Sequence, residues 1–146
     1  MVIDDLLAVA SAENLEGMVV LMPENLAPNP NALLEQFKQA YIAEYGDFPP
    51  MRIPFITSIM EFKAAAEKAN SLDPDAMAAA MEGLEFEAFD GINILIKRQD
   101  LGIERACELI TAAHYAVIQD GELIWVVSYS AQEVYEAANA AIGITK

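Results

Sequence analysis

Residues 17–46, GMVVLMPENLAPNPNALLEQFKQAYIAEYG, carry the pattern that decides the fold. The run from Gly17 to Met22 is apolar and uncharged, which predicts a short strand buried on both faces. Prolines at positions 23, 28 and 30 then prevent regular strand pairing. We therefore expect the chain to cross to another part of the molecule near residues 23–29.

A capped helix is expected after this crossing. Asn29 is the expected N-cap and Pro30 the first helical residue, where the missing N–H of proline costs least. Apolar and aromatic side chains then recur every three or four residues as far as Tyr45. Gly46 stands where a left-handed C-cap residue belongs, so the helix is expected to end there.

The rest of the chain is expected to contain both helices and strands. Helices are expected over residues 3–12, 51–70, 73–83 and 131–143, the last opened by a Ser130–Glu133 capping box, and residues 101–109 have helical character. Strands are expected over residues 92–96, 110–118 and 122–130, with tight turns at Asp90–Gly91 and Asp120–Gly121. This order predicts an α/β fold in which helices pack on a small mixed sheet.

Composition restricts the class of protein and its partners. The chain has 146 residues, 55% of them hydrophobic, which is enough for one globular domain with its own core. Eight basic against 23 acidic residues give a formal net charge of −15, and such a charge repels phosphate backbones. We therefore expect no nucleic-acid partner and interpret the acidic surface as a source of solubility.

Motifs for catalysis are absent from the sequence. It contains no glycine-rich phosphate loop, no paired CxxC and no nucleophile elbow, so we expect neither an enzyme nor a bound metal or cofactor. Cys107 and His114 are seven residues apart and would share a face if both lay on one helix. A catalytic Cys–His pair is thus one reading of these residues; a small buried cysteine is the other.

Nothing in the sequence indicates a membrane segment or a leader. No apolar run reaches the roughly 18 residues of a transmembrane helix. The first residues, MVIDDLLAVASAEN, are acidic and lack the positive region of a signal peptide.

Several motifs occur in the order of one known family. They are GMVVLMP, FKQAYIAEYGDFPP, EFKAAAEKANSLDPDAMAAAMEGLEFEAFDG, NILIKRQD and AVIQDGELIWV, and together they cover most of residues 15–127. In this order and spacing the chain resembles the C-terminal third of a type I periplasmic solute-binding protein, the branched-chain amino-acid receptor family of ABC transporters. Two departures stand out. Ile56 and Thr57 occupy places where the family has an aromatic and then an acidic residue. The segment from Arg98 to Ile118 is longer and more apolar than the corresponding link in the family.

The resemblance implies a fold, a role and a location. It implies a partial three-layer sandwich in which residues 1–146 form a single α/β unit of a two-lobed protein, with the crossing near residues 23–29 joining the lobes. It implies non-enzymatic capture of a small solute, an amino acid or similar metabolite. The parent family works in the periplasm or outside the cell and delivers its solute to an ABC transporter permease.

Site residues, if retained, are expected where the chain crosses between lobes or opens a helix. Glu24 and Asn25 follow the predicted crossing, and Met51, Arg52 and Phe55 open the second large helix. Arg52 is a lone cation among apolar residues and prolines, a setting suited to an anionic ligand group. A surface arginine paired with one of the many acids is the alternative reading.

Two functions follow for a chain of this length. It is either a fragment or a shortened relative of a solute-binding protein that still binds its solute, or a stand-alone α/β interaction module that no longer does. In the second case uncovered apolar surface would pair with a second copy or another chain. For the isolated chain we expect a homo-oligomer, because the elements that match the family normally pack on segments outside this sequence.

Overall fold

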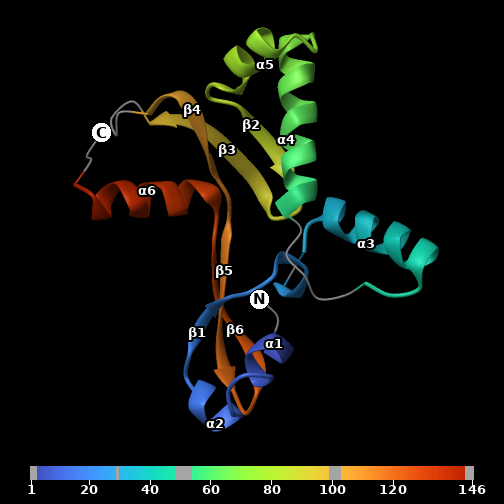
Figure 1. The fold of residues 1–146 in the computed structure, drawn as a ribbon, viewed down its shortest axis with the longest axis vertical. Helices are drawn as coiled ribbons and strands as arrows, with labels where there is room; N and C mark the ends of the chain where they lie inside the picture. The colour runs from blue at the N-terminus through green and yellow to red at the C-terminus, as the bar shows by residue number, and fades with distance from the viewer. Residues whose placement is uncertain (1–2, 29, 49–53, 99–102, 144–146) are drawn as a thin grey trace. The chain divides into compact units, whose positions relative to one another are not determined.

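A computed structural model describes residues 3–28, 30–48, 54–98 and 103–143 of the protein (Figure 1). The chain divides into two compact units, each assembled from two separate segments. The first unit comprises Met1–Ile53 and Ala113–Tyr129, and the second comprises Pro54–Ala112 and Ser130–Lys146. The predicted crossing near residues 23–29 lies within the first unit. As a crossing between the lobes of a longer protein it stays a prediction.

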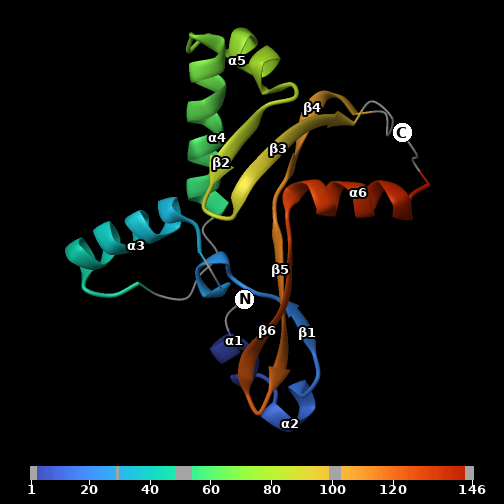
Figure 2. The ribbon, with the colours of Figure 1, turned by 180° about the vertical axis from the view of Figure 1, so that it is seen from behind.

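Most helices precede most strands along the chain: α3, α4 and α5 follow one another, and β2 to β6 then follow before α6, as Figures 1 and 2 show. In chain order they are α1 (Ile3–Leu7), α2 (Ala12–Leu15), β1 (Val19–Leu21), the 3-10 helix η1 (Glu24–Leu26), α3 (Ala32–Tyr45), α4 (Pro54–Ala69), α5 (Pro74–Met81), β2 (Glu85–Ala88), β3 (Gly91–Arg98), β4 (Ile103–Ile110), β5 (Ala113–Gln119), β6 (Glu122–Tyr129) and α6 (Ala131–Ala141). The α/β class predicted from the sequence is confirmed.

The first unit is built on an antiparallel sheet with the strand order β1-β5-β6. Val19 pairs with Val117, and the β5–β6 hairpin closes at Gln119 and Glu122. Asp120 and Gly121 both have positive φ, 51° and 79°, as a two-residue hairpin turn requires. The turn predicted at this position is confirmed.

Strand β1 is less buried than its composition suggested. Val19 is 64% exposed and Leu21 is 46% exposed, while Val20, on the opposite face, packs against Met22 and Ala116. The prediction of a strand buried on both faces was wrong, because β1 lies at the edge of its sheet and only one face is covered.

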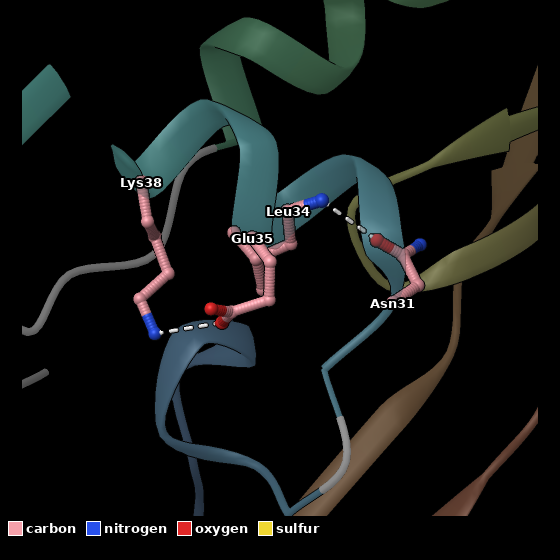
Figure 3. A network of polar contacts seen from close by, with 4 residues as sticks. All are labelled: Asn31, Leu34, Glu35 and Lys38. Atoms are coloured by element: carbon pink, nitrogen blue, oxygen red, sulfur yellow. Dashed lines mark hydrogen bonds and ion pairs between the residues drawn. The ribbon is translucent and has the colours of Figure 1, made fainter. Parts of the chain in front are cut away.

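Helix α3 begins two residues later than expected. The Leu34 backbone N–H donates to Oδ1 of Asn31 at 2.8 Å, so Asn31 is the N-cap (Figure 3). Asn29 was the wrong choice of cap, since α3 begins at Ala32 and Asn31 directly precedes it. Nζ of Lys38 lies 3.0 Å from Oε1 of Glu35 on the next turn. Gly46 has φ of 87° and closes the helix, as predicted.

The second unit has three layers around the antiparallel sheet β2-β3-β4. On one face the buried side chains of Phe86 and Leu95 pack with Ala65 of α4 and Met77 of α5. The side chains that point to the opposite face of β3, such as Ile92, lie on the side of α6, which contacts β3 and β4. Figure 1 shows α4 and α6 on different sides of these strands. The sandwich layers predicted for the fold are therefore present in this unit.

The strand directions differ from the expectation of a small mixed sheet. Every ladder among the described residues is antiparallel. Two of the ladders are antiparallel for a local reason, because the two-residue turns Phe89–Asp90 and Asp120–Gly121 join consecutive strands and reverse the chain. The first of these turns lies one residue before the Asp90–Gly91 turn predicted from the sequence.

The helical character expected for residues 101–109 was wrong from Ile103 onward, and residues 101 and 102 lie outside the described ones. Residues 103–110 form β4, which pairs with β3 through Ile94–Ile110 and Lys97–Cys107. At the N-terminus the helix expected over 3–12 ends at Leu7, and Ser11 caps a second short helix. Two helix starts agree with the sequence: Asp73 caps α5 ahead of Pro74, and Ser130 and Glu133 form the predicted capping box of α6.

Candidate functional site

Two of the residues singled out from the sequence lie on one tight turn of the first unit. Glu24 and Asn25 belong to η1, which directly follows β1. Backbone hydrogen bonds from Leu26 to Pro23 (3.1 Å) and from Ala27 to Glu24 (3.2 Å) close this turn. Because Met22 N–H also donates to the His114 carbonyl at 2.8 Å, the turn is held at the end of the sheet.

These two side chains differ in what they can present to a ligand. Asn25 is 9% exposed and Glu24 is half-buried, and each already takes part in an interaction within the protein. The Asn25 amide is nearly buried, and its Oδ1 atom is enclosed by the protein. Glu24 has its Oε2 atom buried, and a carboxylate accepts hydrogen bonds from an ammonium or hydroxyl group.

Of the other three predicted residues, the structure describes Phe55, which lies at the start of the second unit. Phe55 is in the first turn of α4 and is 85% exposed. Met51 and Arg52 lie outside the described residues. The structure therefore brings together Glu24 and Asn25, and it places Phe55 in a different unit.

The second unit contains a surface pocket that sequence reasoning missed. Its volume is about 310 Å³, at the lower end of the range of small-molecule sites. It lies between the outer face of β3 and the first turn of α6. Its lining residues are Glu85, Asp90, Gly91, Ile92, Ile94, Ser130, Ala131 and Gln132.

The electrostatics of this pocket are acidic. Glu85 and Asp90 contribute carboxylates, and the N-terminus of α6 is already occupied by its own capping box. The Ser130 backbone N–H and hydroxyl both donate to the Glu133 carboxylate at 2.7 Å, which holds the pKa of that carboxyl below its ordinary value. A second anion is therefore disfavoured there, and a small cation with an apolar part suits the pocket better.

The sequence contained signals for both halves of this pocket but no link between them. A turn next to Asp90, one residue from its observed place, and the Ser130 cap were each predicted, yet Asp90 and Ser130 are 40 residues apart and meet only through the packing of α6 on β3. No periodicity or spacing in the sequence predicts the contact between α6 and β3.

The possible Cys107–His114 pair is not supported by the secondary structure. Cys107 lies on β4 of the second unit and His114 lies on β5 of the first. The two residues therefore do not share a helix face, and the prediction of a pair that depended on such a face was wrong. Instead, Nδ1 of His114 lies 2.7 Å from Oγ of Ser128 on the neighbouring strand β6.

In the described ranges no helix combines the length and apolar character needed to span a bilayer.

Comparison with known proteins identifies the fold. No protein-family model and no curated protein matches the chain in sequence. Solved structures do match: an ABC-type branched-chain amino acid transporter protein from Rhodopseudomonas palustris, with a TM-score of 0.60 and 21% identity, and a leucine-binding protein from Thermotoga maritima, with 0.57 and 18%. Each match covers 86% of this chain but only 34% of the other. The resemblance read from the sequence is confirmed at the level of the fold, and the chain spans about a third of these structures.

Proposed function

We propose that this chain binds a small solute, an amino acid or similar metabolite, without chemical turnover. It does so as part of an ABC transporter's substrate-binding protein, or as a shortened relative of one. The observation that carries the proposal is the fold match, which covers 86% of the chain and involves a leucine-binding protein and a branched-chain amino acid transporter protein. Because the match covers 34% of those chains, the solute site is expected to need further segments.

The chemistry of the predicted residues suits a zwitterion. The Glu24 carboxylate can accept hydrogen bonds from an ammonium group, and the guanidinium of Arg52 can hold a carboxylate in bidentate fashion. Phe55, with its exposed ring, can cover an aliphatic side chain. Asn25 and Met51 complete the proposed set. The acidic pocket beside α6 is a second place for a cationic group, and its residues can be tested separately.

The proposal also includes the place of the chain in a larger protein. Residues 1–146 would correspond to the C-terminal third of a two-lobed receptor, with the crossing near residues 23–29 between lobes. Such a receptor would work in the periplasm or outside the cell and would dock on an ABC transporter permease. A chain extended upstream with the rest of a parent protein is the form in which this arrangement can be tested.

Thermal unfolding with a panel of amino acids tests solute binding directly. A ligand at about 100 times its Kd stabilises the folded state by about 2.7 kcal/mol, which raises the melting temperature measurably. We expect one ligand class to give this shift in the chain or its extended form. Arg52→Ala and Glu24→Gln should abolish it, whereas Lys63→Ala, which removes a cation from the exposed Lys63–Glu67 pair, should not.

The proposal would be overturned if no amino acid at millimolar concentration raised the melting temperature of either the chain or its extended form. A response that is lost in Glu85→Gln but kept in Glu24→Gln would move the site to the pocket beside α6.

Exposed apolar side chains favour a second candidate, a self-associating interaction module that no longer binds solute. Val19 and Val126 on the sheet of the first unit are 64% and 52% exposed, and Phe55 and Ile59 on α4 are 85% and 68% exposed. Surfaces of this kind commonly mark interfaces. A stable homo-oligomer with no ligand response would support this candidate, and a strict monomer at tens of micromolar would contradict it.

A further inference from the structure

The pocket beside α6 has a carboxylate at each end. Its lining residues run from the paired residues Glu85 and Ile94 to the turn that contains Asp90. From Glu85 to Ala88, where β2 ends, the strand rises roughly 10 Å, at about 3.3 Å per residue. Asp90 lies beyond Ala88, so the two acidic residues stand at opposite ends of a pocket of about 310 Å³.

The middle of the pocket is apolar. Ile92 and Ile94 project to the same outer face of β3, because alternate residues of a strand share a face. Ile92 is 54% exposed, whereas Ala131 of α6, which closes one side, is 1% exposed. A hydrocarbon chain lying along Ile92 would remove apolar surface from water, which is favourable in proportion to the area that is buried.

Both carboxylates can receive hydrogen bonds from a ligand. Glu85 forms no hydrogen bond or ion pair with another residue in the part of the chain that the structure describes. Asp90 accepts a hydrogen bond at Oδ1 from Nδ2 of Asn93 at 3.1 Å, which helps to hold its side chain in place. A carboxylate offers about four acceptor positions, so Asp90 can accept from an ammonium group as well.

Cations of the protein itself are engaged elsewhere in the second unit. Nζ of Lys63 pairs with Glu67 at 2.7 Å and Nζ of Lys97 with Glu82 at 2.6 Å, while Lys68 donates to the Glu82 carbonyl at 3.3 Å. Among the described residues that line the pocket, none is basic. The formal net charge of −15 also raises the concentration of small cations around the chain. The negative charge of the pocket is therefore left for a cation from solution.

Two anionic ends with an apolar middle match a linear aliphatic diamine, which has an ammonium group at each end and methylene groups between them. We propose that the pocket is a binding site for such a diamine, with one ammonium group at Glu85, the other at Asp90 and the chain across Ile92. The inference rests on the proposed function only in using the pocket named there as a second place for a cationic group. A metal ion is a poorer match, because no group of three His, Cys, Asp or Glu residues in the described ranges could hold one.

Nitrogen-15 correlation spectra of the whole chain, titrated with diamines of four, six, eight and ten carbons at low salt, test the site. Low salt is needed because ionic strength screens exposed charges. We expect Kd values of about millimolar order, since each ammonium contact is partly exposed to solvent. Chemical-shift changes should be concentrated at the amides of Gly91, Ile92 and Ala131.

The amino alcohol of the same length is the matched ligand control, because it replaces one ammonium group by a hydroxyl group. The best diamine should bind about three- to fivefold more tightly than its amino alcohol, as expected for one further exposed ion pair. Glu85→Gln and Asp90→Asn should each bring this ratio close to one. Glu44→Gln removes the same charge from an exposed position on α3 and should leave the ratio unchanged.

A further variant blocks the pocket from within. Gln132→Lys introduces an ammonium group at the first turn of α6, among the lining residues, and should abolish diamine binding. Circular dichroism shows whether each variant remains folded. Mg²⁺ at the concentration of the diamine should not displace it, because the methylene groups contribute contacts that an ion cannot make.

Three outcomes would overturn the inference: equal affinities for diamine and amino alcohol, the same loss of the ratio in Glu44→Gln as in Glu85→Gln, or displacement by Mg²⁺. Each would reduce the effect to general attraction of cations by an acidic chain. The proposed amino-acid site is judged separately, by the melting temperatures with the amino-acid panel. A response to an amino acid without diamine binding sinks this inference alone, and diamine binding without such a response sinks the amino-acid site alone.

Discussion

Nδ1 of His114 lies 2.7 Å from Oγ of Ser128, on paired positions of strands β5 and β6. The same hydroxyl oxygen accepts a hydrogen bond from Nε1 of Trp125 at 3.1 Å. An indole N–H can only donate, so the hydroxyl hydrogen of Ser128 is free to point to His114. We infer that the three side chains form one directed chain, in which the neutral imidazole accepts at Nδ1 and carries its hydrogen on Nε2.

This relationship predicts the tautomer of the only histidine in the chain. Nitrogen-15 correlation spectra of the imidazole, recorded where the ring is neutral, should show the hydrogen on Nε2. Ser128→Ala should reduce this preference, because the donor to Nδ1 is lost, whereas Ser128→Thr keeps the hydroxyl and should retain it. A dominant Nδ1–H form in the wild type would contradict the inferred direction.

The N-cap of α3 predicts a measurable loss of stability. Replacing Asn31 by alanine leaves the Leu34 N–H without its 2.8 Å partner and should cost about 1 kcal/mol. Asn31→Ser restores an oxygen that can cap the helix and should recover most of the loss. Urea unfolding followed by circular dichroism measures both. If Asn31→Ala proves neutral, the cap assignment in Figure 3 is incorrect.

The two faces of β3 predict opposite sensitivities to truncation. Leu95 is 1% exposed and packs with α4 and α5, so Leu95→Ala should cost about 2–5 kcal/mol in the free energy of unfolding. Ile92 lies on the same strand, points to the other face and is 54% exposed. Ile92→Ala should cost less than about 1 kcal/mol, in line with its exposed position. Equal losses in chemical denaturation would show that the faces are assigned the wrong way round.

Two glutamates should respond to pH in opposite directions. Hydrogen bonds from Ser130 lower the pKa of Glu133, so its stabilising effect is present above the ordinary value of 4.5 and is lost as pH falls through the lowered pKa. Burial raises the pKa of Glu61, so the favourable contribution of its neutral form is present below 4.5 and is lost as pH rises through the raised pKa.

Melting temperatures of glutamine variants between pH 3 and pH 7 measure this difference. At pH 7 Glu133→Gln should lower the melting temperature and Glu61→Gln should raise it. Both differences should shrink toward pH 3, where the carboxyl groups become neutral. Shifts of the same sign at pH 7 would rule out one of the two causes.

Signals that reside in a few neighbouring residues were readable from the sequence. Gly46 ends α3, Asp73 and Pro74 open α5, and Ser130 with Glu133 opens α6, because each motif satisfies backbone groups of its own turn. The family-like order of these motifs was sufficient to identify the fold.

Features that depend on distant partners were not readable in the same way. Strand β4 acquires its conformation from pairing with β3, and its own sequence has helical character as well. The exposure of Val19, which is 64% exposed although its strand was expected to be buried on both faces, depends on which face of the sheet is covered. The pocket beside α6 arises from packing between segments 40 residues apart.

The discontinuous first unit has a consequence for biosynthesis. The pairing of Val19 with Val117 joins β1 to a strand that leaves the ribosome almost a hundred residues later, and β1 has no other partner in its sheet. The second unit's sheet, by contrast, forms between residues 85 and 110 from strands that follow one another. Pairing between strands that are distant in sequence is slow to form, and an apolar strand is prone to aggregation until it is paired. On the nascent chain, the segment that is synthesised first is therefore the one whose sheet is completed last.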